Sequence, residues 1–330
     1  MPFVPVDDPT PPRVTVFLPT WNGGPLFEEV LRELVAQETP DPFEILCIDS
    51  GSRDDTTERI RRFRCRLIEI PNSEFNHGLT RNRAVREARG EIVVLTVQDA
   101  TPASRDWLRT MTSHFADPAV AGVFCHQVPR PDCSPFLRER LTHWVRGGGE
   151  PSTRSVASPE EFWALHPTER WMRAQFDNVA SAVRRSFALE HPFPRRQFGE
   201  DVTWAKGAVL ALGRIVMEPR VAVIHSHRNS VWYEFKRAYL DHQNINDLFG
   251  TRLAPRLRDV FAYAAGLTRT LWRVIGEDPT LRPAERWWWR LKAIPFAFTQ
   301  NLGQYLGPLS NVHGRRGLWR AWDALMRRGV

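Results

Sequence analysis

The sequence predicts an α/β protein, with a mostly parallel sheet flanked by helices and a helical extension at the C-terminal end. Three observations support this. Between residues 13 and 100, short apolar runs alternate with segments whose apolar residues recur three and four positions apart. Polar residues and glycines gather directly after each apolar run. From residue 241 onward the patterns are helical and are interrupted by prolines.

The first hundred residues supply four predicted strands and three predicted helices in alternation. Ser52 and Asp55 form the pattern typical of a helix N-terminus, and Gly90 ends the third helix. Alternation of this kind predicts right-handed βαβ units, and such sheets bind ligands at the carboxyl ends of their strands. The predicted strands cover residues 13 to 19, 43 to 50, 66 to 71 and 91 to 100, and the predicted helices cover 26 to 37, 52 to 63 and 79 to 90.

Beyond Ala121 the pattern is less regular. It predicts a Gly/Ser/Pro-rich mobile loop over residues 147 to 159, and prolines are expected to limit the last three helices. Strands are predicted over 122 to 128 and 220 to 227, and helices over 135 to 145, 202 to 213, 253 to 274, 283 to 306 and 316 to 328.

Composition is that of an ordinary soluble globule, with 42% hydrophobic and 25% charged residues. No apolar run approaches the roughly 18 to 20 residues that a spanning helix needs. The N-terminus lacks the basic start and apolar core of a secretion signal, so we expect a cytoplasmic protein. The four cysteines are far apart without a C-x-x-C pair, which predicts buried free thiols rather than zinc ligands or disulfides.

Four polar motifs follow the four predicted strands: PTWNGG, DSGSRDD, NSEFNHG and QDA. Their common position indicates a nucleotide site. No G-x-G-x-x-G follows the first strand, which disfavours a dinucleotide dehydrogenase. The chain also lacks the G-K-[ST] of a P-loop enzyme.

Taken in order, LPTWNGG, IDSGSRDDT, FNHGLTRNRA, TVQDATP, GEDVTWAKGAVLALG and VIHSHRNS resemble the family 2 glycosyltransferases with a GT-A fold, specifically their bacterial rhamnosyltransferase-like branch. Each motif alone is weak, but six in the right order are strong. The resemblance implies a GT-A domain over residues 13 to 240. It would be preceded by a disordered Pro-rich tail, 1 to 12, and followed by a helical, basic, Trp-rich region, 241 to 330.

The resemblance also implies an activity. The enzyme would be an inverting transferase in bacterial cell-surface polysaccharide synthesis, acting on a saccharide or polyprenyl-linked acceptor. The donor would be a nucleotide sugar, with dTDP-rhamnose as the closest match and UDP-hexose or UDP-galactofuranose as alternatives that share these motifs.

The resemblance assigns a donor site at the strand ends. Asp49 would accept a hydrogen bond from the pyrimidine imide, Trp21 would stack on the base, and Asn178 would lie under the sugar. Asp49 could instead cap its turn, and Trp21 could belong to the core. Arg81, which the resemblance places near the base and phosphates, could instead lie on a solvated helix face. The full expected donor site is Pro19, Thr20, Trp21, Asn22, Asp49, Asn76, His77, Gly78, Arg81, Gln98, Asp99 and Asn178.

The motif around Asp99 departs from the family pattern. Members commonly carry D-x-D, whereas this chain has Gln98, Asp99 and Ala100. Mg²⁺ and Mn²⁺ often take only one or two protein ligands beside substrate phosphates. His225 and His227 alternate along a predicted strand and so share a face. We expect Asp99, one of the two histidines and the donor diphosphate to share Mn²⁺ or Mg²⁺.

Glu200 and Asp201 open a predicted helix. The resemblance makes them the catalytic pair, with Asp201 as general base. A carboxylate near a helix N-terminus is expected to stay ionised and to take the acceptor proton. The structural alternative is that Asp201 only caps the helix.

The C-terminal region combines tryptophan with positive charge. The segment from Glu285 onward contains eight basic residues and only two acidic residues, and this excess accounts for most of the net charge of +7. Tryptophan beside basic residues suits a peripheral membrane helix, here on the inner face of the cell membrane. Packing on the catalytic domain or in a homodimer remains an alternative.

Two other classes of function stay open. A nucleotidyltransferase would also need metal and nucleotide, but PTWNGG has no basic residue for a triphosphate. A nucleic-acid-binding protein is suggested only by the pI near 9.7, and we expect no nucleic-acid partner.

Overall fold

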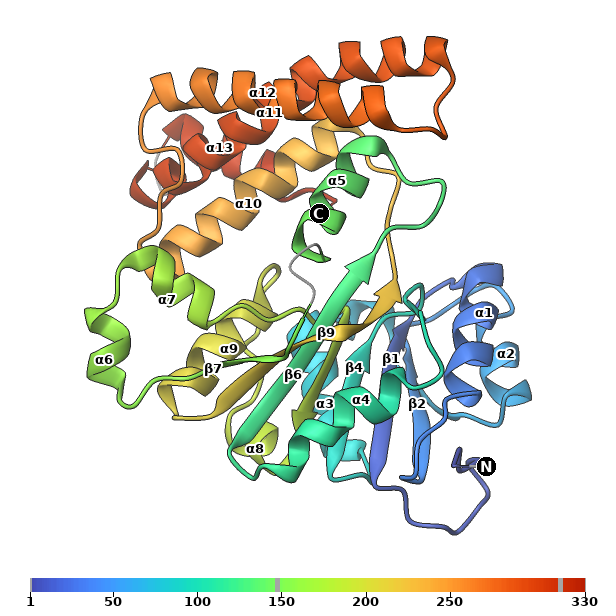
Figure 1. Cartoon of the computed structure of the whole chain (residues 1–330). Helices are drawn as coiled ribbons and strands as arrows, with labels where there is room; N and C mark the ends of the chain where they lie inside the picture. The colour runs from blue at the N-terminus through green and yellow to red at the C-terminus, as the bar shows by residue number, and fades with distance from the viewer. Residues whose placement is uncertain (1, 146–148, 314–316, 330) are drawn as a thin grey trace. The chain divides into compact units, whose positions relative to one another are not determined.

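The computed structural model describes residues 2–145, 149–313 and 317–329, and it divides into two compact units (Figure 1). The first unit comprises Met1–Arg130, Trp144–Leu165 and Met172–His225, and the second comprises Pro131–His143, His166–Trp171 and Ser226–Val330. The second unit therefore begins before residue 241, where we expected the C-terminal region to start. Part of the expected mobile loop, residues 147 and 148, lies outside the described residues, as do Arg315 and Arg316.

The first unit is built on a mixed sheet. Its strands follow the order β3, β2, β1, β4, β8, β6, β9 and β5, and β7 pairs with β9. The pairs among β1, β2, β3 and β4 are parallel, as the alternating pattern predicted. β8 comes from a distant part of the chain and lies antiparallel between β4 and β6, so the sheet is mixed. The bounds are β1 (Val14–Thr20), β2 (Phe43–Asp49), β3 (Arg66–Glu69), β4 (Ile92–Thr96), β5 (Thr101–Pro102), β6 (Val120–Val128), β7 (Ser152–Arg154), β8 (Ala180–Arg184) and β9 (Arg214–Ile224).

Helices lie on both faces of this sheet, with α3 and α4 on opposite sides in Figure 1. This double cover explains why β2 is buried along its whole length and why its sequence is an almost unbroken apolar run. The helices of the first unit are α1 (Gly24–Val35), α2 (Thr56–Arg62), α3 (His77–Glu87), α4 (Trp107–Ser113), α6 (Pro159–Ala164), α8 (Arg185–Glu190) and α9 (Glu200–Leu210).

The start of the chain runs beside β2. Val4 donates its backbone N–H to the Phe43 carbonyl at 2.8 Å, and Phe43 donates to the Pro2 carbonyl at 2.8 Å. Val4 is buried. These residues belong to the segment for which we expected disorder, and the edge hydrogen bonds together with the buried valine order them. All four cysteines are free and buried, as predicted.

The second unit is helical. It contains α10 (Val231–Phe249), α11 (Leu257–Glu277), α12 (Pro283–His313), α13 (Gly317–Arg327) and most of α5 (Pro135–Val145), whereas α7 (Pro167–Arg173) crosses the boundary. The sequence patterns did not single out α10, which packs along α12. Gly303 permits this packing, because a Cβ there would lie 2.9 Å from that of Ala238.

Two prolines that we expected to limit the C-terminal helices lie inside α12, at Pro295 and Pro308. That expectation was wrong. Proline removes one backbone donor and crowds the preceding turn, and here the long packed contact with α10 and α11 outweighs this local cost. Within the described residues, the structure contains no helix with the length and apolar character needed to span a bilayer.

Candidate active site

The carboxyl end of β2 carries Asp49, whose carboxylate is buried in the turn that follows. Oδ1 accepts backbone hydrogen bonds from Gly51 at 3.0 Å and Ser52 at 2.8 Å. Oδ2 accepts from the hydroxyls of Thr20 at 2.9 Å and Ser52 at 2.6 Å. These four bonds match the turn-capping alternative, and they use the lone pairs that a pyrimidine imide would need to share.

The loop after β1 presents an indole to solvent. Trp21 is 54% exposed, so its alternative as a core residue was wrong. Its backbone is fixed from both sides by the Gln98 amide, which accepts from the Trp21 N–H at 2.8 Å and donates to the Trp21 carbonyl at 3.1 Å. Asn22 adopts a positive φ of 48° and ties the loop to Ser52 at 2.8 Å. Gln98 therefore fixes the backbone that carries an exposed indole.

Asp99 faces His225 across the end of the sheet. Asp99 Oδ1 lies 3.5 Å from His225 Nε2. Gln127 Oε1 is 2.7 Å from His225 Nδ1, and the Gln127 amide nitrogen donates to Asp177. Because the Asp177 carboxylate fixes the orientation of the amide, Nδ1 donates to Gln127, and Nε2 is the ring nitrogen that faces Asp99.

This geometry fits a metal ion. Ligand atoms of Asp99, His225 and His227 lie within 4.8 Å of one another. A bare imidazole nitrogen and a carboxylate repel unless a cation or proton lies between them. One carboxylate with two imidazoles is a donor set that suits Mn²⁺ better than Mg²⁺. The hydrogen bond from His225 Nδ1 to Gln127 is the outer-shell contact that metal-binding histidines usually make.

Helix α3 supports the loop that leads into α9. Asn76 caps α3 by accepting from the Leu79 N–H at 3.2 Å, and its amide donates to the Arg196 carbonyl at 3.1 Å. Gly78 is needed because a Cβ there would collide with the backbone of Pro194. We expected both residues at the donor. In the structure, Asn76 hydrogen-bonds to the loop before α9, and Gly78 lies close to the backbone of the same loop.

Arg81 forms a buried ion pair with Glu200, at 2.5 Å between Nη1 and Oε1. Arg81 is only 4% exposed, so its alternative on a solvated helix face was wrong. Burial and the neighbouring Arg81 charge lower the pKa of His77, which favours a neutral imidazole beside this pair. With Glu200 committed to Arg81, Asp201 is the member of the acidic pair left for proton transfer.

Asp201 differs from expectation in two respects. Helix α9 begins at Glu200 with Gly199 as its N-cap, so Asp201 is not the cap. Its pKa is raised from 3.8 to about 7, first by desolvation and then by the charges of Glu200 and Asp177. The expectation that Asp201 stays fully ionised was therefore wrong, because burial and like charges outweigh the helix terminus. A pKa near 7 suits a general base.

Asn178 lies two residues before the start of β8 and is 2% exposed. Its Oδ1 accepts from the Ser181 hydroxyl at 3.0 Å, whereas its Nδ2 has no hydrogen-bond partner. A buried amide donor without a partner is costly, and such groups often mark ligand sites. This observation agrees with the position expected for Asn178 at the donor sugar. Arg184, at the end of the same strand, donates hydrogen bonds to the backbone carbonyls of Phe115 and Asp117.

Sequence reasoning missed Gln127, Arg130 and Asp177. Arg130 donates to the Asp99 carbonyl at 2.9 Å, and Gln127 links His225 to Asp177. Gln127 and Arg130 lie in and just after β6, outside the motifs, so no pattern marked them. Asp177 does lie beside Asn178, but its role depends on a partner 50 residues away.

The mixed sheet with its polar strand ends and flanking helices is the GT-A fold of glycosyltransferases. A mannosyltransferase from Pyrobaculum calidifontis, solved with GDP-mannose and Mn²⁺, has this fold with a TM-score of 0.52 at 22% identity, over 98% of this chain and 86% of that one. Glucosyl-3-phosphoglycerate synthase from Mycobacterium tuberculosis matches with a TM-score of 0.51 at 17% identity, over 74% of this chain and 82% of that one.

Residues 15–184 match the model of glycosyl transferase family 2, and this chain belongs to that family. It is 29% identical over 231 residues to the O-antigen chain rhamnosyltransferase RfbN of Salmonella typhimurium, covering 69% of this chain and 70% of the relative. It is 30% identical, with the same coverage, to the O-antigen chain rhamnosyltransferase WbaN of Salmonella anatum.

Proposed function

We propose that this family 2 glycosyltransferase is a metal-dependent inverting enzyme that transfers a sugar from a pyrimidine nucleotide diphosphate. The observation that carries the proposal is the facing pair of Asp99 and His225, 3.5 Å apart, with His225 Nδ1 held by Gln127 so that Nε2 faces Asp99. A site built in this way for a cation, at the carboxyl ends of parallel strands, suits a nucleotide diphosphate.

In this mechanism Asp99, His225 and His227 would hold the cation, and a cation bound there would offset negative charge on the departing nucleotide diphosphate. Trp21 stacks on the base, and the unpartnered Asn178 Nδ2 donates to the sugar. Asp201 takes the proton of the acceptor hydroxyl as its oxygen attacks the anomeric carbon. Because one carboxylate acts in a single displacement, the configuration of that carbon inverts.

The relatives guide the choice of donor and acceptor. Two O-antigen rhamnosyltransferases align over more than two thirds of this chain. We therefore propose L-rhamnose as the transferred sugar, dTDP as its carrier and a lipid-linked saccharide of the cell envelope as the acceptor.

The first experiment is a thermal-shift panel of dTDP, UDP, GDP and their sugars, with and without Mn²⁺. We expect Tm to rise with a pyrimidine diphosphate only when Mn²⁺ is present, because binding to the folded state stabilises it. Stabilisation by GDP-sugars in preference to both pyrimidine series would contradict the proposed donor class. No shift with any nucleotide would contradict the proposed function.

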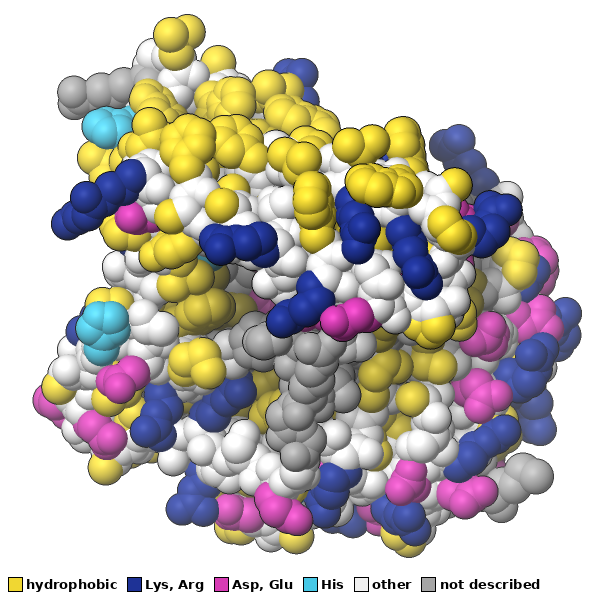
Figure 2. Space-filling model, turned by 45° about the horizontal axis from the view of Figure 1, so that its top comes forward, with side chains coloured by type: hydrophobic (Ala, Val, Ile, Leu, Met, Phe, Trp, Pro, Cys, Tyr) yellow, Lys and Arg dark blue, Asp and Glu magenta, His cyan; other side chains and the backbone are white. Residues whose placement is uncertain are grey.

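The proposed function includes a membrane surface on the second unit. Of the nineteen large apolar side chains that are exposed in the described residues, eleven lie between Leu257 and Leu325. On α12, Trp287, Leu291 and Ile294 follow helical spacing along one side. Figure 2 shows hydrophobic side chains gathered over these helices, with Lys and Arg around them.

Charge favours an anionic bilayer over a second copy as the partner of this face. Residues 251 to 330 contain fourteen Lys and Arg against five Asp and Glu, a net charge of +9. A second copy would bring the same charge and be repelled, whereas each basic residue near an anionic bilayer contributes about 1 kcal/mol.

Vesicle flotation tests this surface. We expect the double variant Trp287→Ala, Trp288→Ala to bind phosphatidylglycerol vesicles at least about tenfold more weakly, because each indole buries apolar area at the interface. Trp163→Ala is the matched control, since Trp163 is 46% exposed in the first unit and should have no effect. Flotation of the double variant like wild type would contradict the membrane assignment. So would a wild-type dimer, detected by light scattering, that the double variant converts to monomer.

A further inference from the structure

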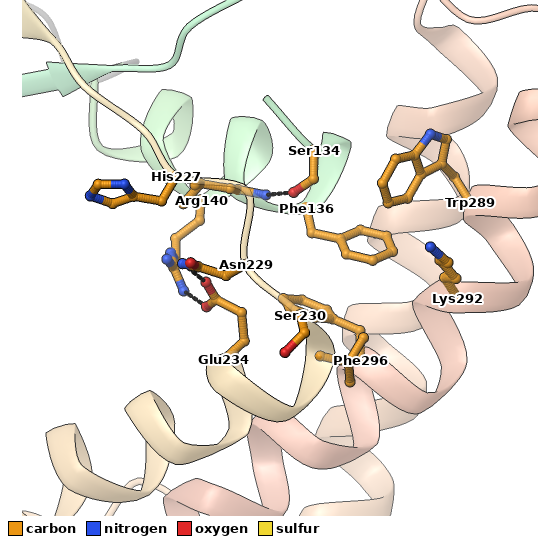
Figure 3. Close-up of a pocket in the computed structure, with 12 residues that line it drawn as sticks. Ser134, Phe136, Arg140, His227, Asn229, Ser230, Glu234, Trp289, Lys292 and Phe296 are labelled. Atoms are coloured by element: carbon orange, nitrogen blue, oxygen red, sulfur yellow. Dashed lines mark hydrogen bonds and ion pairs between the residues drawn. The ribbon is translucent and has the colours of Figure 1, made fainter. Parts of the chain in front are cut away.

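A pocket of about 220 Å³ lies within the second unit, between α5, the segment that leads into α10, and α12 (Figure 3). One wall is aromatic and the other is polar, and all of its lining residues belong to this unit. Its volume is below the roughly 300 to 1,000 Å³ of sites that enclose a whole small molecule. The pocket is therefore sized for one end of a longer ligand.

The aromatic wall is formed by Phe136, Trp289 and Phe296. Phe136 stacks on Phe296 with ring centroids 4.5 Å apart, and it meets Trp289 edge to face at 5.3 Å. These rings belong to an apolar cluster that includes the buried Leu271 and Ile275. Because the rings pack against one another, this wall is preformed and offers apolar contact to a ligand.

Two cations line the pocket, Arg140 on its polar side and Lys292 on α12 beside the aromatic wall (Figure 3). Glu234 is buried, and both of its oxygens are engaged, by Arg140 Nη1 at 2.8 Å and by Asn229 Nδ2 at 2.8 Å. Lys292 differs from Arg140. Its ammonium lies 4.5 Å from the ring centre of Trp288 and 5.1 Å from that of Trp289, and within the described chain no carboxylate forms an ion pair with it. The pocket thus presents a positive charge that the protein does not neutralise.

One end of the pocket is marked by His227, and the other by Lys292 and the tryptophans that it contacts. His227, which lines the pocket, is itself one of the candidate metal ligands. Lys292 stacks on both Trp289, which lines the pocket, and Trp288, which is 56% exposed on the proposed membrane surface. A ligand with a polar head and an apolar chain would match both ends.

We propose that this pocket binds the phosphate end of an anionic amphiphile, that is, a phosphate ester carried on an apolar chain. The phosphate oxygens accept hydrogen bonds from Lys292, and the first carbons of the chain contact Phe136, Trp289 and Phe296. A neutral sugar fits less well, because Glu234 is already engaged on both oxygens. If the proposed function holds, the occupant is the phosphate-bearing head of the lipid-linked acceptor.

Isothermal titration calorimetry on the full chain tests the proposal, with each probe kept below its aggregation concentration. The probes are farnesyl diphosphate, farnesol, inorganic diphosphate and dihexanoyl phosphatidylglycerol. We expect wild type to bind farnesyl diphosphate more tightly than farnesol or inorganic diphosphate. We expect Lys292→Gln to weaken this binding about tenfold, the usual cost of losing a hydrogen bond to a charged group.

Two further variants guard against misfolding. Lys292→Arg keeps the cation and should retain most of the affinity. Lys206→Gln removes a lysine with the same kind of contact, 4.8 Å from the ring centre of Trp163 in the first unit, and should bind like wild type. A preference for farnesyl diphosphate over the short phosphatidylglycerol would support an acceptor lipid as the occupant, and equal affinity would support a membrane phospholipid.

Three outcomes would overturn the proposal: farnesol binding as tightly as farnesyl diphosphate, inorganic diphosphate binding equally well, or Lys292→Gln binding like wild type. Absence of binding by wild type would do the same. Donor binding is measured separately in the nucleotide panel. Failure of that panel would reject the transferase proposal but leave a positive result at Lys292 standing.

Discussion

Replacing Asp201 by asparagine should abolish sugar transfer while making the folded protein more stable at alkaline pH. Loss of a positioned general base is expected to lower kcat by about 10²- to 10⁴-fold. Binding of the metal and nucleotide should persist, because Asp201 contacts neither in the proposed site. In wild type, kcat/KM should rise with pH through an ionisation near 7, the value to which burial and neighbouring carboxylates raise the pKa of Asp201.

The stability change has a defined sign. The pKa of Asp201 is higher in the folded chain than its ordinary 3.8, so the folded state holds an extra proton. This stabilisation is complete below about pH 4 and is lost as the pH rises through about 7. Asparagine does not ionise, so the gain in Tm of Asp201→Asn over wild type should be larger at pH 8 than at pH 5.

Asp177→Asn provides a graded comparison for Asp201. It removes one of the charges that raise the pKa of Asp201, so the acid limb of the rate profile should move to lower pH. Transfer retained by Asp201→Asn would reject Asp201 as the base. Loss of nucleotide binding together with transfer would assign it a structural role instead.

Asp99→Ala should eliminate the Mn²⁺-dependent rise in Tm that a pyrimidine diphosphate produces, and transfer should fall with it. Only this carboxylate among the described residues shares the candidate site with His225 and His227. The loss should exceed the roughly 10- to 100-fold that removal of an outer-shell partner costs. Gln127→Ala, which releases His225 Nδ1, should fall within that smaller range.

The matched control for the metal site is His114→Gln. His114 Nε2 lies 2.7 Å from the Glu218 carboxylate, so it forms a histidine and carboxylate pair in the same unit but outside the candidate site. This variant should respond to Mn²⁺ and nucleotide like wild type. If Asp99→Ala also responded like wild type, the facing pair would be an ordinary ion pair and the metal site would be wrong.

Much of the fold was predictable because its signals are local. The alternation of apolar runs and helical patterns predicted β1 to β4 along the chain, and the helices between successive strands predicted their parallel pairing. The antiparallel insertion of β8 was not predictable, since it depends on contacts between residues such as Leu95 and Ser181. Likewise α12 runs past Pro295, because contacts with α10 outweigh the local preference.

The candidate site likewise has features that the sequence predicts and features that only the folded chain determines. Asp99, His225, Glu200 and Asp201 stand in motifs and could be named from the sequence. The pKa of Asp201 could not, because it depends on burial and on the charge of Asp177, which only the folded chain brings near.

The neutral side chain of Gln98, beside Asp99, affects how tightly the candidate site should bind a metal ion. Gln98, the neighbour of Asp99, binds the backbone of Trp21 and contributes no charge, so Asp99 is the one carboxylate of this motif. One carboxylate and two neutral imidazoles leave a divalent ion with a residual charge of +1, which a diphosphate can neutralise. We therefore expect weak metal affinity in the free enzyme and cooperative loading with the donor. Turnover would then follow the cellular concentration of the metal–nucleotide complex rather than that of either component.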